Sequence, residues 1–175
     1  MNILYCGDKS MQKGILLSSM SLIGNVEEPL NIYILTVDYS EKGVNYNPVD
    51  KAFAKYLERK LNKLDSEVNV FLVDVTRYFV EELPEANMQS RFTACCMLRL
   101  FADKTDIKER VLYLDTDVLC RKDFSDFYYQ NMDGIEIAGV SDYYGRWLFG
   151  DGYINSGVMP VSYTHLRAHE TAANL

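Results

Sequence analysis

Short apolar runs alternate with longer amphipathic segments along most of the chain. The runs are rich in β-branched and aromatic residues and end at polar or turn-forming residues, which is typical of buried strands. On this basis the sequence predicts strands at residues 2–6, 30–37, 68–75, 110–114 and 134–140, and a further strand entered at Val158 after an aromatic, glycine-rich loop at 143–157. Strands and helices that alternate in this order predict an α/β domain with a largely parallel sheet.

Three segments between these strands are predicted to be helices. The first, residues 11–23, repeats its apolar side chains at helical spacing. The second begins at Asn47-Pro48, since asparagine caps helices and proline suits the first helical position, and its apolar stripe runs to Leu64. Ser90 can cap the third, which extends to about Ala102.

Composition narrows the class of protein. A chain of 175 residues with 48% hydrophobic content suits one globular domain. With 18 basic and 25 acidic residues, the net charge of −7 gives no electrostatic attraction for nucleic acid, so no nucleic-acid partner is expected.

No transmembrane segment is predicted, because no run approaches the ~20 apolar residues that span a bilayer. The N-terminus lacks the pattern of a signal peptide. Four cysteines without a CxxC pair indicate reduced thiols and a cytoplasmic protein.

The C-terminal residues differ from the rest of the chain. Residues 161–171 resemble one translated reading frame of a sequencing adapter, so we expect the natural sequence to end near Met159 and residues 160–175 to be a non-native tail with few specific contacts. Both histidines, His165 and His169, lie in this tail. Their i, i+4 spacing with Glu170 could also indicate a metal-binding helix. Residues 1–159 contain no histidine, so Ser-His-Asp and Cys-His catalytic systems are excluded from that part.

The most informative motif is Asp115-Thr116-Asp117, which follows the apolar run Val111–Leu114. A buried strand brings these carboxylates to its carboxyl end, where open α/β sheets bind ligands, and strand alternation would point both the same way. Hard oxygen donors favour Mn²⁺ or Mg²⁺, which commonly share their coordination shell with phosphate oxygens. The motif therefore predicts a metal–diphosphate site. A solvated acidic turn is the alternative.

Four stretches in this order resemble glycosyltransferase family 8, which includes bacterial lipopolysaccharide galactosyl- and glucosyltransferases and the glycogenins. They are residues 2–8, 90–100, 112–117 and 153–159. The resemblance implies a GT-A (nucleotide-diphospho-sugar transferase) fold, a mixed and mostly parallel sheet flanked by helices, which would be incomplete at the C-terminus of this chain. It also implies metal-dependent transfer of glucose or galactose from UDP-glucose or UDP-galactose to a saccharide or other hydroxyl acceptor, with retention of configuration.

The resemblance also implies a set of site residues. Asp8 would contact the uracil or ribose of the donor, although it could equally cap the helix that follows. Arg91 and Arg99 would approach the donor phosphate or sugar, while Arg99 could also be an exposed arginine without a special role. Asp115 would bind metal and ribose, and Asp117 would bind metal.

The remaining implied positions line the donor site. They are Thr116, Asp142, Asn155 and Gly157. A simple turn is the alternative for Asn155-Ser156-Gly157. The aromatic residues of the 143–149 loop could stack on an acceptor sugar or cover the core.

Two family motifs do not occur in this sequence: the His-x-x-Gly-x-x-Lys-Pro motif with the third metal ligand, and the Gln-Asp motif that precedes it. A nucleotide-binding remnant without turnover is therefore an alternative function. A phosphohydrolase that uses its Asp-x-Asp as nucleophile and acid/base is a second alternative, although such a motif is expected earlier in the chain.

Overall fold

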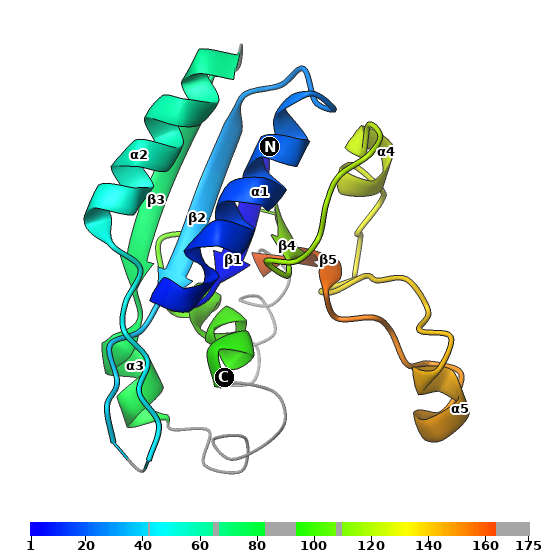
Figure 1. Cartoon of the computed structure of the whole chain (residues 1–175). Helices are drawn as coiled ribbons and strands as arrows, with labels where there is room; N and C mark the ends of the chain where they lie inside the picture. Colours follow the sequence, from blue (N-terminus) through cyan, green and yellow to red (C-terminus); the bar gives the residue numbers. More distant parts are fainter. Residues whose placement is uncertain (42, 65–66, 83–93, 108–109, 164–175) are drawn as a thin grey trace.

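The computed structural model describes residues 1–41, 43–64, 67–82, 94–107 and 110–163. Its centre is a five-stranded sheet with the strand order β3-β2-β1-β4-β5 (Figure 1). The strands are β1 (Asn2–Cys6), β2 (Leu30–Thr36), β3 (Val68–Asp74), β4 (Arg110–Leu114) and β5 (Val158–Ser162). The first four run parallel, and β5 runs antiparallel to β4. The predicted α/β class with a mostly parallel sheet is confirmed.

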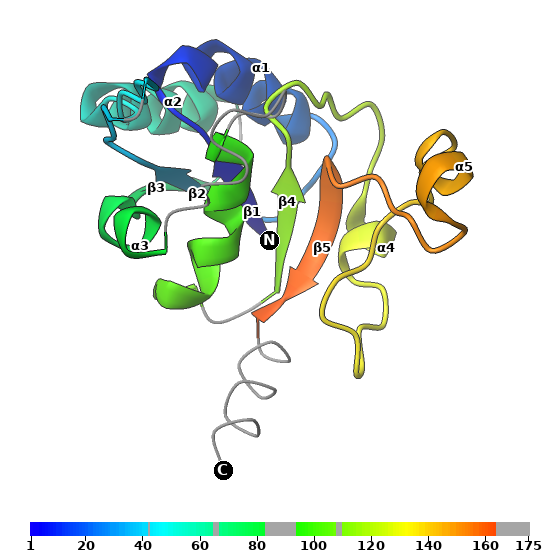
Figure 2. The same cartoon turned by 90° about the horizontal axis from the view of Figure 1, so that it is seen from below.

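Helices cover both faces of the sheet (Figure 2). The α-helices α1 (Gln12–Ile23) and α2 (Lys51–Leu61) lie on one face, and α3 (Thr76–Glu81) and the 3₁₀-helix η4 (Ala94–Lys104) lie on the other. The shorter helices are η1 (Lys9–Met11), η2 (Asn62–Leu64), α4 (Ser125–Tyr128) and α5 (Gly145–Phe149). Both figures show α5 projecting away from the sheet. None of the described helices is long and apolar enough to cross a membrane.

Strand β1 lies at the centre of the core, and all five of its residues are buried. Because side chains alternate along a strand, Ile3 and Tyr5 pack with α1 and α2, whereas Leu4 and Cys6 pack with α3 and η4. Burial on both faces explains why this strand is almost continuously apolar in sequence.

The strand order reverses at β1. Strands β1, β2 and β3 follow one another outward through α1 and α2, and the chain then returns to place β4 on the other side of β1. In open α/β sheets, ligands bind in the crevice at the carboxyl ends of the strands where the order reverses. The segments after β1 and β4 are therefore the expected location of a site.

The predicted strand at 134–140 is wrong. Gly134 adopts a positive φ of 69°, and Ile137 contacts β5 only through an isolated bridge to Val161. Ile135, Ile137 and Val140 are exposed, so the apolar pattern here does not reflect burial. This segment instead borders the edge of β5, where the Ala138 amide donates to the Pro160 carbonyl at 3.1 Å.

Two helix predictions need correction. Helix α2 begins at Lys51 rather than at Asn47-Pro48, and Asp50 is its N-cap residue. The backbone before it is held away from helical geometry because the Val49 amide donates to Thr36 Oγ1 at 2.9 Å. The third helix is a 3₁₀-helix in its described part and extends to Lys104, while Ser90 lies outside the described residues.

The prediction of few specific contacts beyond Met159 is also wrong for residues 160–163. Strand β5 continues through Ser162, and Val161 and Ser162 pair with Val111 and Arg110 of β4. The Ser162 amide donates to the Glu136 carbonyl at 2.7 Å. Tyr163 is buried in the core. Residues 160–163 are therefore an integral part of this fold, whereas His165 and His169 lie outside the described residues.

Candidate donor and metal site

Asp115 lies at the carboxyl end of β4, where the strand order reverses. Its Oδ1 accepts a hydrogen bond from the Tyr113 hydroxyl at 2.5 Å, and its amide donates to the Gly157 carbonyl at 2.8 Å. A Cβ atom at position 157 would lie 2.8 Å from Asp115 Oδ2, which is too close for any real contact. The carboxylate is thus enclosed by a hydroxyl on one side and a glycine on the other.

The chain turns immediately after Asp115. The Val118 amide donates to the Asp115 carbonyl at 3.2 Å, and Thr116 and Asp117 form the turn. The strand alternation expected to align both carboxylates therefore ends at Asp115. Asp115 is half-buried and Asp117 is exposed, so the two residues differ in their access to solvent.

Helix α1 contacts this turn through a glycine. A Cβ atom at Gly14 would lie 2.5 Å from the Thr116 carbonyl oxygen and 3.1 Å from the Thr116 Cβ. Only glycine allows the helix and the turn to approach this closely. The position of the Asp-x-Asp turn therefore depends directly on α1.

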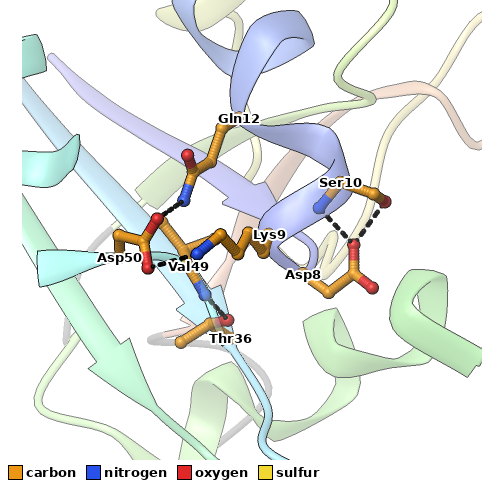
Figure 3. Close-up of polar contacts among 7 residues, drawn as sticks. All are labelled: Asp8, Lys9, Ser10, Gln12, Thr36, Val49 and Asp50. Atoms are coloured by element: carbon orange, nitrogen blue, oxygen red, sulfur yellow. Dashed lines mark hydrogen bonds and ion pairs between the residues drawn. The ribbon is translucent and has the colours of Figure 1, made fainter. Parts of the chain in front are cut away.

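Asp8 follows β1 and caps the short helix η1. Its Oδ1 accepts hydrogen bonds from the amide of Ser10 at 3.0 Å and from the hydroxyl of Ser10 at 2.5 Å (Figure 3). The capping role considered from the sequence is therefore confirmed. Figure 3 also shows Lys9 and Gln12 directed toward the Asp50 carboxylate, to which they donate at 3.0 Å and 3.2 Å. These contacts tie the turn after β1 to the start of α2.

A second hydrogen-bonded chain joins Asp142 to the Asn155–Gly157 loop. Asn155 Nδ2 donates to Asp142 Oδ2 at 3.3 Å, and the Gly157 amide donates to Asn155 Oδ1 at 2.9 Å. Asp142 Oδ1 accepts the amides of Tyr144 and Gly145, at 2.9 Å and 2.6 Å. The hydrogen bond from the Gly145 amide is the main reason why the pKa of Asp142 is lowered, so this residue is ionised at neutral pH.

Arg99 connects η4 to the same loop. Its Nη1 donates to the Ser156 carbonyl at 2.8 Å, and its Cζ lies 4.7 Å from the centre of the Tyr113 ring. It is therefore not an exposed arginine without partners. Arg91, the other arginine expected near the donor, lies outside the described residues.

The cysteines close to the site have raised pKa values, mainly because they are buried. All four cysteines are free, as expected for reduced thiols. Burial raises the pKa of Cys95 to about 12 and that of Cys6 further above its ordinary range. The pKa of Cys96 is also raised, mainly by burial. Because the thiolate is the reactive form, these side chains act as core residues near neutral pH.

The donor set fits a hard divalent cation that is only partly coordinated by protein. Asp115 and Asp117 offer carboxylate oxygens just after the carboxyl end of β4, which suits Mn²⁺ or Mg²⁺ better than softer metals. Within the described part of the chain, no group of three or more histidine, cysteine, aspartate or glutamate side chains is arranged to hold a metal ion. Phosphate oxygens and water would have to complete such a shell.

The 143–149 loop does not cover the core. It contains helix α5, which the sequence did not predict, and its large side chains are exposed, with Tyr144 at 79% and Trp147 at 83%. Phe149 stacks on Tyr153 with ring centres 4.9 Å apart. Of the two interpretations made from the sequence, covering the core is therefore wrong.

Comparison with known proteins decides the family. The model of glycosyl transferase family 8 matches residues 2–169, which is nearly the whole chain. The chain belongs to glycosyltransferase family 8. The match continues ten residues beyond Met159, the predicted end of the natural sequence, while the non-native origin of residues 160–175 stays a prediction.

Individual relatives agree with the family assignment. The chain is 25% identical to the glycosyltransferase GlyA of Streptococcus pneumoniae over 169 residues, which cover 93% of this chain and 22% of GlyA. The crystal structure of the galactosyltransferase LgtC in complex with donor and acceptor sugar analogues superposes with a TM-score of 0.73 at 18% identity, over 97% of this chain and 60% of LgtC. GlyE of Streptococcus pneumoniae superposes with a TM-score of 0.64 at 20% identity, over 99% of this chain and 36% of GlyE. The family 8 chain therefore has the GT-A fold and spans less than two thirds of these relatives.

The sequence analysis did not predict two residues that contact the candidate site. Tyr113 and Gly14 both contact the Asp-x-Asp segment, yet neither was singled out. For Tyr113 a signal existed, because it lies two residues before Asp115 and residues so spaced in a strand share a face. For Gly14 there was none, because a glycine in a helical pattern does not reveal which segment lies beside it.

Proposed function

We propose that this chain forms the donor-binding part of a metal-dependent family 8 hexosyltransferase. The parent reaction would transfer glucose or galactose from UDP-glucose or UDP-galactose to a saccharide or other hydroxyl acceptor, with retention of configuration. The observation that carries the proposal is the position of Asp115, half-buried at the strand-order reversal with its carboxylate oriented by Tyr113. Family membership and the GT-A fold support a transferase over the phosphohydrolase alternative.

In this proposal, Asp115 and Asp117 hold Mn²⁺ or Mg²⁺, and Asp115 also contacts the ribose. The bound cation would supply charge neutralisation for the departing diphosphate. Asp8, which follows β1 next to β4 in the sheet, would meet the uracil or ribose. Its second carboxylate oxygen, Oδ2, is directed away from Ser10 in Figure 3, so capping and donor contact are compatible.

The sugar pocket is assigned to Asp142, Asn155 and Gly157, with Thr116 next to the metal ligands. The hydrogen-bonded chain from Asp142 through Asn155 to Gly157 supports this assignment, since it joins these residues directly to Asp115. Arg91 and Arg99 are proposed to approach the donor phosphate or sugar. Free cysteines support a cytoplasmic location for the parent protein.

Binding without turnover is the second candidate for the chain as it stands. It rests on the described donor set of two carboxylates and on the absence of the family's His-x-x-Gly-x-x-Lys-Pro motif from the sequence. Removing one electrostatic donor from an active site commonly costs about 10²–10³ in rate. UDP release from UDP-glucose and UDP-galactose with Mn²⁺ would distinguish the candidates: we expect none above background from this chain.

The donor proposal predicts that UDP binding requires a divalent cation. Two carboxylates repel a diphosphate unless a cation lies between them, so calorimetric titration of UDP should show binding with Mn²⁺ and none with EDTA. Asp117→Ala should lose at least tenfold in affinity with Mn²⁺. Asp133→Ala, which removes an exposed aspartate outside the site, is the control and should bind as the unsubstituted chain does. Equal affinity with and without metal, or in Asp117→Ala, would contradict the proposal.

A further inference from the structure

Tyr113 is an unusual residue to find beside a candidate metal ligand, because it belongs to the core. The side chain is only 2% exposed and packs in the cluster formed with η4 and α3. Its hydroxyl nevertheless reaches the Asp115 carboxylate at 2.5 Å. The tyrosine hydroxyl is the donor in this hydrogen bond, and the carboxylate oxygen is the acceptor.

Arg99 holds the tyrosine ring and the neighbouring loop together. Its guanidinium lies over the Tyr113 ring and donates to the Ser156 carbonyl. The next residue along the chain, Gly157, accepts the Asp115 amide. The arginine therefore connects the residue that contacts the Asp115 side chain with the loop that contacts the Asp115 backbone.

A pocket of about 220 Å³ lies beside this ring and is lined by Arg99, Tyr113, Met159 and their neighbours. The hydroxyl–carboxylate bond and the arginine contact therefore add to the core packing that holds the ring. The same bond leaves Asp115 Oδ2 facing Gly157, where no side chain could be accommodated.

We propose that Tyr113 is a positioning residue, whose hydroxyl holds the Asp115 carboxylate in the orientation in which it meets a cation and diphosphate, while Arg99 holds the Tyr113 ring. This rests on the proposed donor function but adds a role that the Asp-x-Asp motif alone does not define. Hydrogen-bond partners of metal-binding carboxylates orient them, and their loss typically costs about 10- to 100-fold in metal affinity.

The first test compares crystal structures of the chain and its Tyr113→Phe variant, which removes only the hydroxyl. We expect the Asp115 side chain to adopt a different rotamer or to become disordered in the variant. Tyr5→Phe is the matched control, because Tyr5 is equally buried but its hydroxyl donates to Ser18 on the other face of the sheet. An unchanged Asp115 side chain in Tyr113→Phe would overturn the proposal.

The second test measures UDP affinity with Mn²⁺ as a double-mutant cycle. Tyr113→Phe should weaken binding about tenfold in the unsubstituted chain and should cause no further loss in Asp115→Asn, because the hydroxyl would act through that carboxylate. Tyr5→Phe should stay within about twofold. A full additional loss in Asp115→Asn, or no loss in the unsubstituted chain, would overturn the positioning role.

A failure of the proposed donor function can be distinguished from a failure of the positioning role of Tyr113. If the unsubstituted chain binds no UDP in the presence of Mn²⁺, the proposed function is wrong, and the rotamer comparison alone decides whether Tyr113 orients Asp115.

Discussion

Gly157 is the residue at which the smallest substitution should disturb the candidate metal site. A methyl group there would lie 2.8 Å from Asp115 Oδ2 and 3.2 Å from Asn155 Oδ1. Neither neighbour can withdraw without losing a contact, because the other oxygen of the Asp115 carboxylate accepts from Tyr113 and the Asn155 oxygen accepts the Gly157 amide. Glycine is therefore needed at position 157 because these two side chains leave no room for a Cβ atom.

We predict that Gly157→Ala weakens Mn²⁺-dependent UDP binding by at least tenfold, because the Asp115 carboxylate must move. Its cost in the free energy of unfolding should be about 1–3 kcal/mol, as for other overpacked positions. Gly152→Ala is the matched control, since a Cβ atom there meets nothing within 4 Å, and it should change neither property. Calorimetry and urea denaturation measure the two effects. Unchanged UDP affinity in Gly157→Ala would contradict the account of this contact.

At the residue scale, the charged residues of the candidate site were easier to predict from the sequence than the neighbouring residues that contact them. Asp115 could be selected because it follows an apolar strand, whereas Asp142 was selected through the family resemblance. Tyr113 shares a strand face with Asp115 in sequence spacing, but only the structure shows that its hydroxyl contacts the carboxylate. Asp8 shows a related limit, since one carboxylate can both cap a helix and face a crevice.

At the element scale, the approach of α1 to the Asp-x-Asp turn is the decisive contact. Gly14 lies in the first turn of α1, and a Cβ atom there would lie 2.5 Å from the Thr116 carbonyl oxygen. That oxygen is backbone, so it cannot move without moving the turn. Alanine is otherwise the better helix former by about 1 kcal/mol. The contact therefore opposes the intrinsic preference of the helix.

We predict that Gly14→Ala destabilises the fold by about 1–3 kcal/mol, because overpacking exceeds the gain in helix propensity. Displacement of Thr116 should also weaken Mn²⁺-dependent UDP binding. Gly24→Ala, at the other end of α1 with nothing within 4 Å, is the control and should be neutral or stabilising. A Gly14→Ala variant as stable as the unsubstituted chain would show that α1 and the turn are not in contact.

Strands and helices were predictable to different degrees. Strands β1, β2 and β4 have continuous apolar runs because they lie inside the sheet, and their predicted positions and that of the edge strand β3 were confirmed to within one residue. The 134–140 segment has the same apolar character but only isolated bridges, and side-chain pattern alone does not report whether a neighbouring strand is present. The start of α2 was misplaced because Val49 is bonded to Thr36, a contact distant in sequence.

At the scale of the whole molecule, β5 extends the sheet beyond Met159. It is the one antiparallel strand among the five described, and three of its five pairs with β4 involve residues 160–162. The sequence did not predict this pairing, because residues 160–175 were interpreted from their resemblance to a sequencing adapter, which says nothing about their contacts. The strand order, on which the location of the site depends, likewise follows from long-range pairing that periodicity does not encode.

We predict that a chain ending at Met159 is at least about 3 kcal/mol less stable than one ending at Tyr163. The shorter chain loses the buried side chains of Val161 and Tyr163, each of which contributes about 1.5–3 kcal/mol, together with the pairs at 160–162. Thermal and urea unfolding of the two chains measure the difference. Stabilities that agree within about 0.5 kcal/mol would contradict the structural role of residues 160–163.

The central claim is that Asp115 and Asp117 bind a divalent cation together with the diphosphate of a UDP-sugar. The most direct measurement is an anomalous difference map, recorded at the manganese edge, from a crystal of the chain grown with UDP and Mn²⁺. We predict a single strong peak within about 2.5 Å of carboxylate oxygens of both residues, with diphosphate oxygens completing the shell. UDP bound without such a peak, or a manganese peak away from Asp115 and Asp117, would contradict it.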